Sequence, residues 1–107
     1  MITAPDADTG MTRLDEIVQS LRQILPVVRE RFHVVSLGVF GSYVRGLQTE
    51  QSDLDLLVSF SKTPSLFKLV DLENYLADEL HVKVDLVMKE SLKPRIGERI
   101  LREVIPV

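Results

Sequence analysis

The chain has 107 residues, of which 45% are hydrophobic, and it carries a formal net charge of −3 with no cysteine. That length fits one domain with a modest core, the acidic balance argues against non-specific nucleic-acid binding, and the lack of cysteine excludes disulfides and thiolate metal sites. No signal-like start or membrane-length apolar run is visible, so we expect a cytoplasmic protein that contacts neither nucleic acid nor membrane directly.

The N-terminal part of the chain predicts a tail followed by a helix. Residues 1–11 offer little to bury, so we expect a flexible tail, and residues 12–107 are expected to form the single domain. Apolar side chains recur at helical spacing from Leu14 to Val28, after a capping-box pattern of Thr12 with Asp15. Pro26 lies inside this pattern, so the helix should bend there, or end and restart at residue 27.

The rest of the chain predicts strands alternating with helices. Strands are expected at residues 34–40, 53–60 and 82–88. A short helix should follow Gly41 and end at Gly46, and a longer one, capped by Ser65, should run from residue 66 to residue 80. A last helix, beginning near Pro94, is expected to pack on the sheet. This order predicts an α/β domain with one small sheet and helices packed on it.

Carboxylates interrupt two of the predicted strands. Asp53 and Asp55 are two residues apart, so their side chains point to the same face, while the leucines between them face the core. Asp85 likewise interrupts the apolar run of the third strand. Strand interiors seldom contain Asp, and adjacent carboxylates raise each other's pKa unless a cation lies between them. Residues that break such preferences often mark a functional site.

Three carboxylates on neighbouring strands favour phosphoryl or nucleotidyl transfer with two metal ions. Oxygen ligands suit Mg²⁺, which one or two carboxylates and the substrate's phosphates typically hold. Two such ions bind the attacking and leaving oxygens of an in-line displacement. We therefore assign Asp53, Asp55 and Asp85 as catalytic residues and ligands of two Mg²⁺ ions.

The Gly41-Ser42 pair opens the short helix and predicts a phosphate-binding turn. The Ser42 hydroxyl and backbone N–H are placed to meet a β- or γ-phosphate. Arg45, one turn later, is expected either to bind phosphate through its planar fork or to pair with a surface acid. Tyr43 is a candidate for stacking on a base.

These motifs carry a family resemblance. Gly41-Ser42, ten intervening residues, then Asp53-Leu54-Asp55, with Asp85 on a later strand, resembles the signature of the DNA polymerase beta-like nucleotidyltransferase superfamily. The wider Gly-Ser-Tyr-Val-Arg-Gly run and the small size resemble its minimal nucleotidyltransferase branch, the MNT-domain antitoxins paired with HEPN-domain toxins. The fold implied is a small mixed sheet with helices packed on it, of α/β (α+β) class.

The resemblance also implies an activity and residue roles. Members transfer a nucleoside monophosphate from a nucleoside triphosphate to a hydroxyl, and the antitoxins move AMP from ATP onto a tyrosine of the toxin, a ribonuclease. Carried over, Gly41 and Ser42 bind the triphosphate, Asp53 and Asp55 bind both Mg²⁺ ions, and Asp85 completes the shell of the catalytic ion. Because 107 residues leave little room for an acceptor domain, we expect the acceptor to come from a partner protein.

Two other functions stay open from the residues alone. One is an antitoxin that neutralises its toxin by occlusion without catalysis. The other is a nucleotidyltransferase that acts on a small hydroxylated molecule. The intact set of carboxylates favours catalysis over occlusion. The base preference, the number of AMP units transferred, the oligomeric state and the surface that meets the partner are not set by the sequence.

Overall fold

A computed structural model describes residues 12–107, so the predicted tail lies outside the described residues. The elements are α2 (Arg13–Phe32), β1 (Val34–Phe40), α3 (Ser42–Arg45), β2 (Leu54–Phe60), α4 (Leu66–Leu80), β3 (Val84–Met88), the 3₁₀ turn η1 (Lys89–Ser91), α5 (Pro94–Glu103) and β4 (Ile105–Pro106). The predicted α/β class is confirmed. The short strand β4 and the turn η1 are the elements that the sequence pattern missed.

The four strands form one mixed sheet in the order β3-β2-β1-β4. β1 pairs antiparallel with both β2 and β4, whereas β2 and β3 run parallel. A parallel pair needs a crossover connection, and α4 supplies it. The carboxyl end of β1 therefore lies beside the amino ends of β2 and β3, where the glycine turn and the carboxylates meet.

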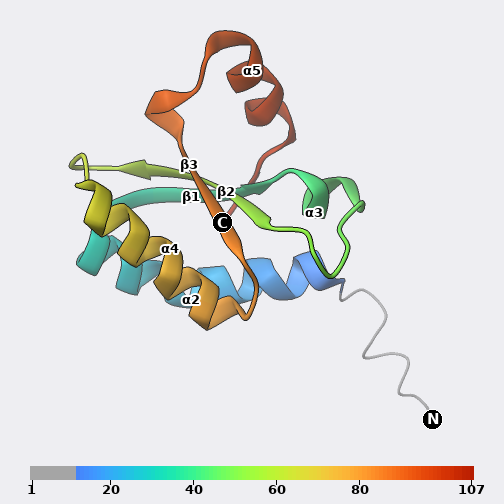
Figure 1. The fold of residues 1–107 in the computed structure, drawn as a ribbon, viewed down its shortest axis with the longest axis horizontal. Coiled ribbons are helices and arrows are strands. Elements are labelled where there is room, and N and C mark those ends of the chain that lie inside the picture. The colour runs from blue at the N-terminus through green and yellow to red at the C-terminus, as the bar shows by residue number, and fades with distance from the viewer. Residues whose placement is uncertain (1–11) are drawn as a thin grey trace.

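Helices α2 and α4 lie side by side on one face of the sheet and enclose the core (Figure 1). Alternate residues of each strand face these helices, as the period of two requires. The fully buried side chains of this core include Ile17, Leu21, Val28, Val39, Leu54, Leu56, Val58, Leu72 and Leu76. None of the helices within residues 12–107 has the length and apolar character needed to cross a membrane.

Helix α2 confirms the predicted start but not the predicted break. The Thr12 side chain accepts a hydrogen bond from the Asp15 N–H, and the Asp15 side chain accepts one from the Thr12 N–H. Pro26 lies inside one continuous helix, so the expectation of an end and restart at residue 27 was wrong. Pro26 is exposed, while Leu25 and Val28 on either side of it are buried. Core packing on both sides therefore offsets the missing backbone hydrogen bond.

Helix α5 does not pack flat on the sheet, contrary to expectation. It rises from the face opposite α2 and α4 (Figure 1), and its one buried residue is Gly97. Ile96 and Leu101 keep 58% and 47% of their surface exposed. The free face of the sheet carries Asp55 and Asp85, and a helix packed flat on it would bury these carboxylates without partners. The chain instead arches away and returns through β4.

Candidate active site

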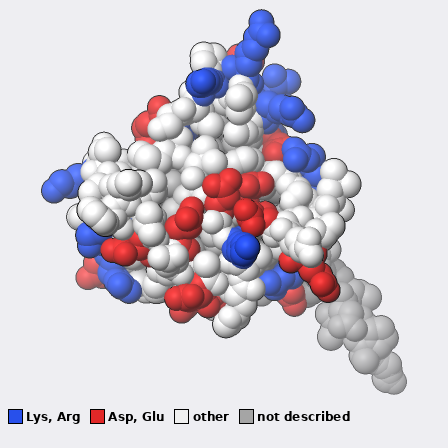
Figure 2. All heavy atoms as spheres, in the orientation of Figure 1, with Lys and Arg blue, Asp and Glu red and all other residues white. Residues whose placement is uncertain are grey.

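Two of the three predicted carboxylates, those of Asp55 and Asp85, lie side by side on the free face of the sheet, and Asp53 is close to them. Asp55 of β2 lies directly beside Asp85 of β3 in the parallel register, so the two side chains share a face. Asp53 precedes β2 by one residue and acts electrostatically on Asp55. Figure 2, seen from the same direction as Figure 1, shows acidic side chains gathered near the middle of the side that faces the viewer. The structure thus pairs Asp55 with Asp85 and keeps Asp53 near them, and we call Asp53, Asp55 and Asp85 the acidic trio.

The trio holds more negative charge than its surroundings neutralise. Partial burial raises the pKa of Asp55, and the neighbouring carboxylates of Asp85 and Asp53 raise it further. Arg45 acts in the opposite direction and lowers the pKa of Asp55. A cation bound between the carboxylates would relieve this repulsion, so the electrostatics favour a metal at this place.

Gly41 forms a turn against Asp55 that a larger residue cannot form. Its backbone lies at φ 81° and ψ −151°, a region essentially confined to glycine. A Cβ added to Gly41 would lie 2.1 Å from Oδ2 of Asp55. Phe40, the preceding residue, pairs with Asp55 across the β1–β2 ladder. The glycine turn therefore places the start of α3 next to Asp55.

Ser42 begins α3 immediately after this turn. As the first residue of α3 it has no intrahelical acceptor for its N–H. This N–H is thus available to a phosphate next to Asp55. Tyr43, by contrast, is buried in the core with 6% exposure, so the suggestion that it stacks on a base was wrong.

Arg45 pairs with an acid that sequence analysis did not single out, Glu103 at the end of α5. Its Nη1 lies 3.0 Å from Oε1 of Glu103, and the Gly41 N–H donates to Oε2 of the same carboxylate at 2.7 Å. Glu103 thus connects α5 to the glycine turn. The sequence did offer one signal for this contact of Glu103. An acidic side chain in the last turn of a helix is unfavourable for the helix dipole, so it requires another partner. Of the two roles expected for Arg45, the structure shows the pairing with an acid. The remaining N–H groups of Arg45 can still donate to phosphate.

The carboxylates fit Mg²⁺ held together with a substrate, rather than a closed protein site. Within residues 12–107, no three His, Cys, Asp or Glu side chains form a group that could hold a metal ion by themselves. Mg²⁺ retains waters and is usually bound by one or two carboxylates plus substrate phosphates. The adjacent oxygens of Asp55 and Asp85, supported by Asp53, match that donor set.

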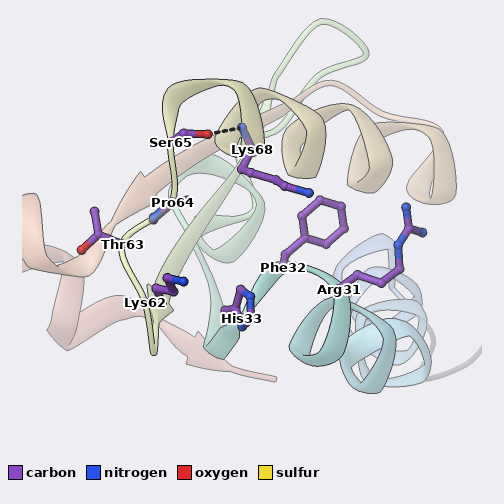
Figure 3. A pocket seen from close by; sticks show the side chains of 8 residues that line it. All are labelled: Arg31, Phe32, His33, Lys62, Thr63, Pro64, Ser65 and Lys68. Carbon is purple, nitrogen blue, oxygen red and sulfur yellow. Dashed lines mark hydrogen bonds between the residues drawn. The ribbon is translucent and has the colours of Figure 1, made fainter.

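A separate cavity of about 220 Å³ lies at the far end of the sheet from the acidic trio (Figure 3). It is lined by residues at the end of α2 and the start of α4, among them Arg31, His33, Lys62 and Lys68. Cationic side chains repel Mg²⁺, and the carboxylates lie at the opposite ends of β1 and β2. This cavity is therefore not the metal site.

Comparison with known proteins gives consistent matches. The family profile described as a nucleotidyltransferase domain matches residues 21–107. The protein adenylyltransferase MntA of Thermococcus cleftensis is 52% identical over 98 residues, which are 92% of this chain and 99% of that protein. Among solved structures, one assigned as a minimal nucleotidyltransferase is 37% identical with a TM-score of 0.74, covering 92% of this chain and 99% of the other. A toxin–antitoxin structure with AMP-PNP is 25% identical with a TM-score of 0.64, covering 89% of this chain and 72% of the other.

Proposed function

The chain belongs to the nucleotidyltransferase domain family and is a nucleotidyltransferase, and from that premise we propose that it is an antitoxin that adenylylates a partner protein. The proposed reaction moves AMP from ATP to a tyrosine hydroxyl of a HEPN-type ribonuclease toxin and so neutralises the toxin. The similarity to a protein adenylyltransferase over nearly its whole length supports AMP as the group transferred and a protein as the acceptor. The similarity to a toxin–antitoxin structure supports the antitoxin role.

One observation carries the proposal: Asp55 lies beside Asp85 on the sheet and against Gly41 of the glycine turn. Acids that serve only the fold have no reason to gather where their charges repel. Ser42, which we propose to bind phosphate, directly follows Gly41 and therefore begins next to Asp55. This combination is what a nucleoside triphosphate with its metal ions requires.

The chain's own groups bind and orient the substrate in this proposal. The Ser42 N–H and hydroxyl bind phosphate oxygens, Arg45 donates its free N–H groups to the triphosphate, and Asp53, Asp55 and Asp85 hold two Mg²⁺ ions. The bound metal supplies charge neutralisation and lowers the pKa of the attacking hydroxyl. The hydroxyl oxygen bonds to the α-phosphorus, the bond to the bridging oxygen of the β-phosphate breaks, and pyrophosphate leaves. The hydroxyl proton goes to a carboxylate of the trio or to water.

The experiment is a transfer assay with α-labelled ATP, MgCl₂ and the candidate toxin. The native chain should label the toxin and abolish its ribonuclease activity, while Asp53→Asn and Asp55→Asn should do neither. Toxin silenced equally by the native chain and by both variants would show that occlusion, not catalysis, neutralises it. Label that reaches only small hydroxylated molecules, with the toxin unchanged, would contradict the protein acceptor.

A further inference from the structure

The cavity of about 220 Å³ between the end of α2 and the start of α4 has a basic lining (Figure 3). We call it the basic cavity, and its lining residues are Arg31, Phe32, His33, Lys62, Thr63, Pro64, Ser65 and Lys68. Three of them carry a positive charge at neutral pH, and none is Asp or Glu. The whole chain has 16 acidic and 13 basic residues, so the charge of this lining is opposite in sign to that of the molecule. The basic cavity therefore attracts anions.

The cationic side chains of the basic cavity have no acidic partner in the part of the chain that the structure describes. None of Arg31, Lys62 and Lys68 takes part in an ion pair there. The Arg31 guanidinium instead lies over two aromatic rings, with its central carbon 5.3 Å from the centroid of Phe32 and 5.2 Å from that of Tyr75. These contacts hold the guanidinium through its flat face and leave the N–H donors at its edge for a ligand.

Hydrogen bonds fix the two walls of the basic cavity. The His33 carbonyl at the end of α2 accepts hydrogen bonds from the Ser61 N–H at 2.9 Å and from the Ser61 hydroxyl at 3.3 Å. The Ser65 hydroxyl accepts one from the Lys68 N–H at 3.2 Å, where the same loop enters α4. Because the backbone on both sides is already held, little of it has to be ordered when a ligand binds.

Size and charge select the class of ligand. Cavities that bury drug-sized molecules measure about 300–1,000 Å³, so the 220 Å³ of the basic cavity suits a small anion. A phosphoryl group carries about −1.5 to −2 charges at pH 7 and three acceptor oxygens, whereas a carboxylate carries one charge and two oxygens. Three cationic side chains therefore match a phosphoryl group better. The planar fork of Arg31 suits two phosphate oxygens, and the lysines add point charges.

We infer that the basic cavity is a binding site for a phosphoryl group, either of inorganic phosphate or of a small phosphate monoester. The inference does not depend on the proposed function, because the cavity lies at the opposite ends of β1 and β2 from the acidic trio. A bound phosphoryl group would connect the end of α2, the loop after β2 and the first turn of α4. A ligand that binds only the folded chain stabilises it, so the fold should gain stability in phosphate.

The test is a titration of the full ¹⁵N-labelled chain with inorganic phosphate or glycerol 3-phosphate in the absence of Mg²⁺, followed by NMR at individual backbone N–H groups. The signals of His33, Thr63 and Lys68 report the basic cavity. The signal of Ser42 reports the proposed catalytic site separately. Sodium acetate and sodium chloride at equal ionic strength serve as the carboxylate and the salt controls.

Two variants with the same net charge test the cationic side chains. The cavity variant Arg31→Gln/Lys68→Gln removes two positive charges from the lining. The control variant Arg22→Gln/Arg29→Gln removes two from exposed positions of α2 outside the lining. Thermal unfolding without phosphate checks that both variants fold.

In the native chain we expect saturable shifts at the three cavity signals and a higher unfolding temperature in phosphate than in chloride. The cavity variant should bind phosphate about tenfold more weakly or worse at these signals, since losing one hydrogen bond to a charged group typically costs that much. The control variant should bind as the native chain does. Tighter binding of glycerol 3-phosphate would support a monoester as the ligand, and tighter binding of phosphate would support the free ion.

Three results would overturn the inference. Shifts confined to Ser42, or no saturable shift at all, would show that the basic cavity binds no phosphate, and the first would still agree with the proposed function. Equal weakening in the two variants would show that net charge alone explains the binding. Acetate that saturates the cavity signals as tightly as phosphate would show that the cavity does not select a phosphoryl group.

Discussion

The glycine turn gives the sharpest test of the site, because two glycines with positive φ flank one short helix and only one of them lies against Asp55. Gly41 and Gly46 flank α3, and both have positive φ, at 81° and 72°. A Cβ on Gly41 would meet Asp55 Oδ2 at 2.1 Å, whereas a Cβ on Gly46 would meet nothing within 4 Å. Gly46→Ala is therefore a matched control that carries backbone strain without the clash.

Gly46→Ala should lower the free energy of unfolding by about 1–2 kcal/mol, the usual cost of a left-handed non-glycine residue. Gly41→Ala adds the displacement of Asp55 to a backbone cost of about 1–3 kcal/mol. Forcing extra volume into a packed site costs about 1–3 kcal/mol more. The total for Gly41→Ala is then about 2–6 kcal/mol. The displaced Asp55 carboxylate should also lose its part in metal binding.

Urea denaturation of both variants, with and without MgCl₂ and ATP, measures these effects together. Gly46→Ala should keep the stabilisation by MgCl₂ with ATP and keep AMP transfer, while Gly41→Ala should lose both. The reasoning would be refuted if the two variants lost the same stability and both remained active, because the contact between Gly41 and Asp55 would then have no consequence.

Three further predictions concern the charged groups of the site. Asp85→Asn should reduce AMP transfer about a hundredfold or more while the fold persists, and near-native kcat/KM would contradict its metal role. Because the folded state raises the pKa of Asp55, its charged form costs stability above that pKa and the cost disappears as pH falls through it. Metal-free Asp55→Asn should therefore unfold at a higher temperature than the native chain at neutral pH, with the difference closing in acid; equal unfolding at every pH would exclude the predicted repulsion. Glu103→Ala should cost about 1.5–3 kcal/mol by leaving Arg45 and the Gly41 N–H without their acceptor, and a double-mutant cycle with Arg45→Ala should be non-additive; additive losses would show that the two side chains act separately.

The sequence by itself determined the local structure and the composition of the site. Hydrophobic spacing placed the main helices and strands, and the period of two put Asp55 on the face away from the core. Gly41-Ser42 marked the turn that begins α3. These features depend on residues close together in the chain, where geometry leaves few choices.

Only the tertiary structure decided which distant residues meet. The direct pairing of Asp55 with Asp85 depends on the register of two parallel strands joined by α4, which no local pattern sets. Glu103 reaches Gly41 across 62 residues, and β4 pairs with β1 although it is only two residues long. The position of α5 is set by these long-range contacts and by the charge on the sheet face below it. Strand periodicity gives the direction of a side chain, but its neighbour depends on how the whole chain folds back on itself.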